Sequence, residues 1–72
     1  MLVQQGDAVR GTQLLRMATT LAPGDPGIRL HYAKALAKIG DKAGARRELE
    51  AVAAADRAGT LRAETNKLKS EL

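Results

Sequence analysis

The side chains best suited to chemistry are few, and their spacing builds no catalytic or metal site. His31 is the only histidine, and no acidic residue lies three or four positions from it to orient the ring. Ser70, the only serine, lies far along the chain in a charged stretch, so no serine–histidine pair is indicated. The absence of cysteine removes the Cys/His clusters that bind zinc. We predict a non-enzymatic chain with no cofactor and no metal.

Three aspartates are the other candidates for acid–base or metal chemistry. Asp7, Asp25 and Asp41 each follow a turn signal and precede a helical run, which is the position of a helix N-cap. Pro26 follows the second of them, and proline is favoured at the first helical position. We therefore interpret all three carboxylates as helix caps.

The residues between these caps follow a helical period. No segment alternates apolar and polar residues as a strand would, and apolar residues recur at spacings of three and four. We predict an all-α chain of three to four helices over 7–22, 26–39, 42–55 and 61–72, with neighbours antiparallel because their connections are short. The predicted inward-facing residues are Leu14, Leu15, Ala18, Leu21 and Ala22, then Ile28, Tyr32, Ala35, Leu36 and Ile39, then Ala45, Leu49, Val52 and Ala53, and last Leu61, Leu68 and Leu72.

Length and charge limit the class further. A chain of 72 residues makes one small domain, whose stability depends on close helix packing or on a partner. The net charge of +4 suits acidic partners but is also within what solubility requires. No apolar stretch reaches the length of a transmembrane helix, and the first residues lack the pattern of a secretion signal. The compartment therefore stays open.

Gly-Asp occurs twice, at residues 6–7 and 40–41, and this spacing predicts an internal repeat. Aligning residues 2–23 with 36–57 also pairs Leu15 with Leu49. An offset of 34 residues is the period of one helical-hairpin repeat. In each copy the glycine would end one helix and the aspartate would cap the next, so residues 1–5 are predicted to be the last turn of an earlier helix.

This pattern resembles the tetratricopeptide repeat (TPR) family, whose members stack helical hairpins into a solenoid. The residues that carry the resemblance are Tyr32, Ala33, Leu36, Gly40, Asp41, Ala45, Leu49 and Val52, with Gly6, Asp7, Gly11, Leu15, Ala18, Leu21 and Pro23 before them. The resemblance implies a short solenoid fragment with a partial repeat over 1–24, a complete repeat over 25–59 and a capping helix over 60–72. Residues 23–50 are also similar to the last repeats of bacterial TPR proteins linked to exopolysaccharide and exosortase systems.

Some residues depart from the family pattern. Arg29 stands where a large apolar residue is usual, and Arg57 stands opposite Pro23 of the first repeat. Asn66 and Ser70 fall where apolar residues are expected, which fits a terminal helix because the end of a stack needs one polar face.

In the TPR family the first helix of each hairpin lines a concave groove, which implies a partner-binding face on helix 26–39. The implied groove residues are Leu30, His31, Lys34, Ala37 and Lys38. Two lysines one turn apart favour an extended or helical peptide that carries carboxylates. The main predicted function is therefore a protein–protein interaction module.

Two other functions stay open. An incomplete repeat would leave Leu14, Leu15, Met17 and Leu21, and with them Val3 and Val9, partly uncovered, so a homodimer through helix 7–22 is the principal alternative. A small basic DNA-binding domain is a weaker alternative, because the basic residues are scattered and the only Arg pair, 46–47, adjoins glutamates.

Overall fold

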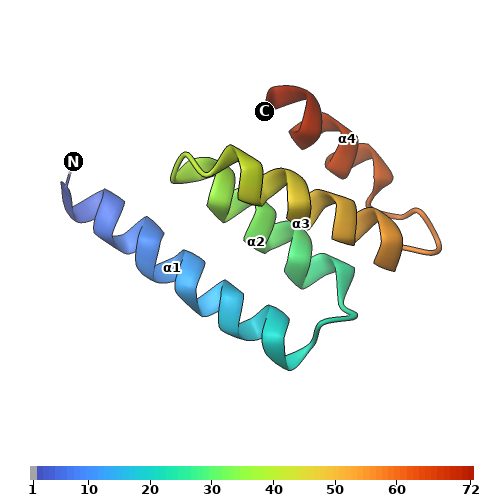
Figure 1. The fold of residues 1–72 in the computed structure, drawn as a ribbon, viewed down its shortest axis with the longest axis horizontal. Helices are drawn as coiled ribbons and strands as arrows, with labels where there is room; N and C mark the ends of the chain where they lie inside the picture. The colour runs from blue at the N-terminus through green and yellow to red at the C-terminus, as the bar shows by residue number, and fades with distance from the viewer. Residues whose placement is uncertain (1) are drawn as a thin grey trace.

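Four α-helices and short loops make up the part of the chain that the structure describes. The computed structural model describes the backbone of residues 2–72 and the side chains of residues 8–72. The helices are α1 (Leu2–Leu21), α2 (Pro26–Lys38), α3 (Lys42–Ala55) and α4 (Arg62–Glu71). Figure 1 shows α1 and α4 at opposite edges of the molecule, with α2 and α3 between them. The described part of the chain contains no strand, so the all-α prediction is confirmed.

Two of the three predicted aspartate caps are present. The Oδ1 atom of Asp25 accepts hydrogen bonds from the backbone N–H groups of Gly27 at 2.9 Å and Ile28 at 3.2 Å. The Oδ1 atom of Asp41 accepts from the N–H of Gly44 at 2.9 Å. These bonds satisfy amide groups that the first turn of a helix leaves without an internal partner, and they fix where α2 and α3 begin.

Gly40 ends α2 by adopting a left-handed backbone conformation, with φ of 92°. Its N–H donates to Ala37 at 3.1 Å, and the N–H of Asp41 donates to Leu36 at 2.9 Å. This pair of bonds is a Schellman turn, which satisfies carbonyl groups at the end of a helix. The predicted hairpin turn is confirmed at this position.

The same dipeptide does not form a turn at Gly6 and Asp7, because α1 is continuous from Leu2 to Leu21. The predicted helix end at Gly6 and the predicted cap at Asp7 are therefore wrong. A glycine inside a helix costs about 1 kcal/mol, which weakens the helix without ending it.

The core lies between α2, α3 and α4. Leu30 and Ala33 of α2 meet Leu49 and Val52 of α3, and all four are buried. Three leucines that precede, lie in or follow α4 pack against this cluster, as predicted: Leu61, Leu68 and Leu72. Helix α2 is covered on most of its circumference. Its buried residues therefore include Leu30 and Ala33 as well as the predicted Leu36. Ala53, in contrast, is exposed although it was expected to face inward.

Helix α1 packs on α2 through a face that is not formed mainly by the leucines of the predicted apolar stripe. Among its side chains that the structure describes, Thr12 and Thr19 are buried, whereas Leu14 and Leu21 of the predicted stripe are exposed. Each buried hydroxyl donates to a carbonyl of its own helix at 2.7 Å, that of Ala8 for Thr12 and that of Arg16 for Thr19. Since these bonds satisfy the hydroxyl donors, threonine can be buried there without an unpaired donor.

Candidate protein-binding surfaces

Helix α2 exposes a single stripe of side chains. His31, Lys34 and Lys38 are its exposed residues, and their spacing of three and four places them on one face. Three of the five predicted groove residues therefore lie together at the surface. Ala37 is partly buried, and Leu30 is only 3% exposed. Leu30 is thus a core residue and is not available to a partner.

The stripe borders a cleft between α2 and α4. Lys34 Nζ lies 3.3 Å from Glu64 Oε2, and this ion pair joins α2 to α4. The cleft has a volume of about 440 Å³ and is lined by Lys34, Glu64, Lys67, Leu68 and Glu71. Four of these five residues come from α4, at positions i, i+3, i+4 and i+7 of that helix.

The cleft combines both signs of charge with one apolar side chain. Two lysines and two glutamates surround Leu68, which is partly buried against the core. Such a lining can bind a peptide by alternating ion pairs and one apolar contact. It does not present the uniformly basic surface that an acidic peptide alone would favour.

Sequence reasoning did not find the α4 half of this cleft. We predicted that residues 60–72 form a capping helix, and we interpreted its charged outer face only as a solvent-exposed surface. The signal was present in two forms: the helical spacing of Glu64, Lys67, Leu68 and Glu71, and the offset of 34 residues that relates Lys34 to Leu68.

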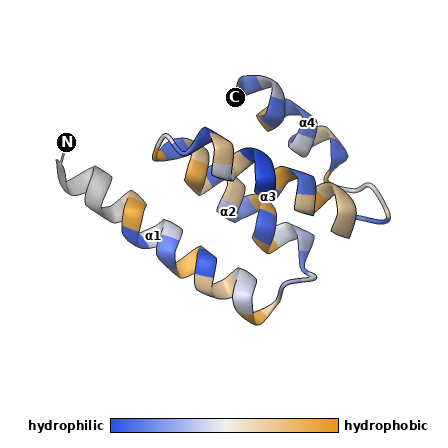
Figure 2. Ribbon diagram, in the orientation of Figure 1, coloured by the Kyte–Doolittle hydropathy of each residue, from blue (hydrophilic) through white to orange (hydrophobic). Residues whose placement is uncertain are grey.

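Helix α1 presents the second surface, which we call the α1 face. Leu14 and Met17 are each 61% exposed, and Leu21 is 86% exposed. Val9 is 44% exposed, whereas Leu15 is partly buried. The expected exposure of an apolar stretch on this helix is therefore found, and Val3 lies outside the described side chains. Figure 2 shows hydrophobic bands alternating with hydrophilic ones along the described part of α1, and mostly hydrophilic colouring on α4.

Asp56 has a structural role in the loop before α4. Its carboxylate accepts from the N–H of Leu61 at 2.8 Å and from the N–H and hydroxyl of Thr60 at 3.2 and 3.1 Å. The bond from the Leu61 amide, with those from Thr60, holds the pKa of this carboxyl below its ordinary value of 3.8. The residue lies outside both surfaces and orders the turn between α3 and α4.

Within residues 8–72, no three His, Cys, Asp or Glu side chains gather as a metal site would require. A membrane-crossing helix is likewise not found among the four helices described.

Comparison with known families places most of the helical region in one of them. The sequence matches the profile of the tetratricopeptide repeat family over residues 2–68. Comparison with curated proteins and with solved structures gives no match.

Proposed function

Since the chain belongs to the tetratricopeptide repeat family, generally a non-enzymatic scaffold for protein–protein interaction, we propose that it binds a partner polypeptide in the cleft between α2 and α4. The observation that carries this proposal is the cleft of about 440 Å³ beside the only exposed stripe of α2. Helix α2 is otherwise covered by its neighbours. A partner that contacts this helix must therefore approach along His31, Lys34 and Lys38.

The lining favours an extended peptide with alternating charges and one apolar residue. Lys34 already faces Glu64 at 3.3 Å, so a carboxylate of the peptide would have to compete with that glutamate. Both side chains are about half exposed, and an ion pair of this kind contributes only about 0–1 kcal/mol, so little stability is lost in the exchange. A lysine of the peptide would meet Glu64 or Glu71, and an apolar side chain would meet Leu68.

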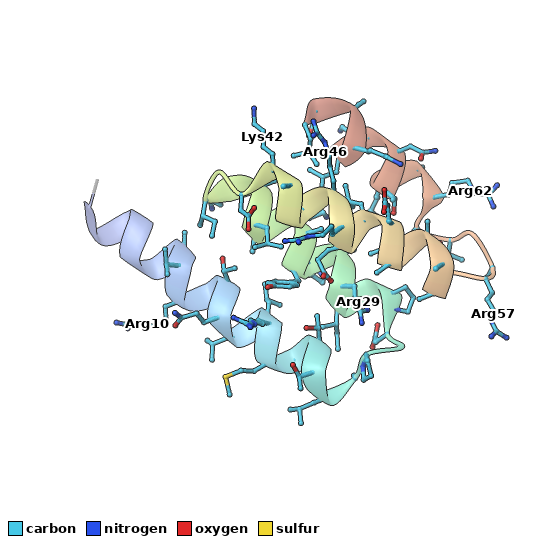
Figure 3. The ribbon with its side chains drawn as sticks, in the orientation of Figure 1. Arg10, Arg29, Lys42, Arg46, Arg57 and Arg62 are labelled. Carbon is cyan, nitrogen blue, oxygen red and sulfur yellow. The ribbon has the colours of Figure 1, made fainter. Side chains whose placement is uncertain are left out.

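Titration with two short synthetic peptides tests this function. Both carry a central leucine; one has only glutamates around it, and the other alternates glutamate and lysine. We expect the alternating peptide to bind more tightly and its affinity to fall at least about tenfold in the Lys34→Glu, Lys38→Glu double variant. Arg57→Glu is the matched control, because Arg57 is exposed in the loop after α3 and points away from the helices (Figure 3). If the double variant and Arg57→Glu lost the same affinity for the alternating peptide, the proposal would be contradicted.

Self-association through helix 7–22 is the second candidate. The exposure of Leu14, Met17 and Leu21 favours it, because a contiguous apolar face is rare on a soluble monomer. Light scattering after size-exclusion chromatography over a hundredfold range of concentration tests it. A dimer that persists on dilution would support this function, and a constant monomer mass would exclude it.

Two narrower predictions receive less support. Basic side chains such as Arg10, Lys42 and Arg57 point out from different edges of the molecule (Figure 3), which is not the compact basic face that DNA binding uses. DNA affinity that fails to rise as salt is lowered would dismiss that function. The link of residues 23–50 to bacterial exopolysaccharide and exosortase systems rests on sequence resemblance alone, and co-purification with such a system would test it.

A further inference from the structure

The offset of 34 residues relates the positions of the helices as well as their sequences. Thr12 and Thr19, buried where α1 packs on α2, are equivalent to Arg46 and Ala53 of α3. These two residues face α4: the Nη2 atom of Arg46 donates to the carbonyl of Leu72 at 3.2 Å, and Ala53 lines a small space with Thr65. Helix α1 therefore turns towards α2 the side that α3 turns towards α4.

This equivalence identifies what the α1 face lacks. On α3, the side towards α2 is covered: Gly44 is buried, while Glu48, Ala51 and Ala55 are partly buried. The equivalent residues of α1 are, in the same order, Arg10, Leu14, Met17 and Leu21, and all four are exposed. The α1 face is thus equivalent to the surface of α3 that packs against α2.

The shape of the α1 face suits a helix with larger side chains than those of α2. Gly11 and Ala18 of α1 are equivalent to the larger residues Ala45 and Val52 of α3. The middle of the α1 face is therefore more recessed than the equivalent surface of α3. A Cβ atom added at Gly11 would meet no atom within 4 Å, which shows that the space above it is open. Leu14, Met17 and Leu21 stand beside these small residues and can enclose an apolar side chain of an incoming helix.

The charge of the α1 face favours an acidic partner. Arg10 precedes Leu14, Met17 and Leu21 by four, seven and eleven residues, so it lies on the same face. Figure 3 shows Arg10 pointing away from the other helices. Residues 8–21 contain a second arginine, Arg16, and no acidic residue, and the acidic residue before them in α1 is Asp7. A carboxylate opposite Arg10 would pair with it when the face is covered.

A second copy of this chain meets these requirements poorly. In an antiparallel pairing of two α1 helices, each Arg10 would lie near Leu21 of the other copy, and residues 8–21 supply no carboxylate to pair with it. Helix α4 of a second copy is also poorly suited to cover the α1 face. Leu30 and Ala33, the residues of α2 that meet α3, are equivalent to the charged residues Glu64 and Lys67 of α4.

We propose that the α1 face is the docking site for an amphipathic, acidic helix of a different polypeptide. The helix lies antiparallel to α1, in the position that α2 has on α3, with large apolar residues over Gly11 and Ala18 and a carboxylate on Arg10. This surface is separate from the cleft between α2 and α4, so the two sites bind independently.

Two designed amphipathic peptides test the proposal on the full chain. They share one leucine-rich face and differ only at the flanking positions, which are glutamates in one and lysines in the other. Fluorescence anisotropy measures their affinities. We expect the glutamate peptide to bind at least about tenfold more tightly than the lysine peptide, and Arg10→Glu to reverse this preference. Leu14→Gln should abolish binding of both, whereas Ile39→Gln, a change at an exposed apolar residue outside the face, should leave both unchanged.

The remaining outcomes overturn the proposal. Failure of both peptides to bind, or equal affinities that Arg10→Glu does not change, would show that the face does not select an acidic helix. A dimer that survives dilution and dissociates in the Leu14→Gln variant would assign the face to a second copy. Lys34→Glu separates this site from the cleft, since it should change only the binding of extended peptides.

Discussion

Arg29 of α2 and Glu48 of α3 form an ion pair in which Nη1 lies 3.0 Å from Oε1, with only 23% and 20% of the two side chains exposed. The Nε atom of Arg29 also donates to the carbonyl of Pro23 at 2.7 Å. One guanidinium therefore joins the loop after α1 to both helices of the complete hairpin. It does so where a large apolar residue is usual in the family, so a polar bridge replaces an apolar contact.

Removing the charge of Glu48 should destabilise the protein. In Glu48→Gln the mostly buried guanidinium of Arg29 loses its counter-charge, so we expect the free energy of unfolding to fall by about 1–2 kcal/mol. Urea unfolding followed by circular dichroism measures this change. Glu50→Gln, an exposed change on the same helix, should stay within about 0.5 kcal/mol of the parent. Similar losses in both variants would show that the pair contributes nothing specific.

Acid should weaken the protein partly through Asp56. The pKa of this carboxyl is lowered by folding, so its contribution to stability is present above the ordinary value of 3.8 and is lost as the pH falls through the lower folded value. Asp56→Asn removes the titrating group. Thermal unfolding between neutral pH and strongly acidic pH should show a smaller acid-induced drop in Tm for this variant than for the parent. An unchanged drop would mean that other carboxyls account for the acid sensitivity.

Two glycine-to-alanine changes should act in opposite directions. Gly40 has φ of 92°, which an alanine adopts only with strain, so Gly40→Ala should lower the free energy of unfolding by about 1 kcal/mol. Gly11 lies inside α1 with open space where a Cβ atom would be added, so Gly11→Ala should raise the same quantity by about 0.5–1 kcal/mol through helix propensity. Denaturant unfolding compares the two. A stabilising Gly40→Ala would contradict the Schellman turn.

Thr65 should be replaceable by valine with a gain in stability. Its hydroxyl is buried and has no hydrogen-bond partner in the protein. Because Thr65→Val keeps the shape and removes an unsatisfied polar group, we expect Tm to rise by about 4–8 °C, the effect of about 1 kcal/mol. Thr19→Val is the control: its hydroxyl donates to the carbonyl of Arg16 at 2.7 Å, so a similar gain is not expected there.

The sequence predicted the elements of the fold better than their exposed faces. Caps and turns depend on local chemistry, so Asp25, Asp41 and Gly40 were assigned correctly from neighbouring residues. Gly6 was not, because a glycine can also lie inside a helix, which it weakens by about 1 kcal/mol without ending it. The helical period also could not show that α2 is covered from more than one side. Leu30 was assigned to the groove from the family resemblance, although it lies in the core.

The candidate cleft was predicted on one helix and missed on the other. His31, Lys34 and Lys38 followed from the family resemblance, but the facing residues depended on how α4 settles on α2. That arrangement is long-range: Lys34 and Glu64 lie 30 residues apart in the chain. A charged terminal helix has the same sequence pattern whether its outer face is solvated or lines a cleft.

Helix α1 packs chiefly on one neighbour, α2, whereas α2 and α3 each pack on more than one helix, and this has a consequence for the internal motions of α1. In a stack held by nearest-neighbour contacts, α1 can open locally while the α2–α3 hairpin stays closed. Backbone amides of α1 should then exchange with solvent deuterium faster than those of α2 and α3. A helix that binds α1 would add the missing neighbour and slow that exchange, so occupancy of the surface would be readable as amide protection along the whole of α1.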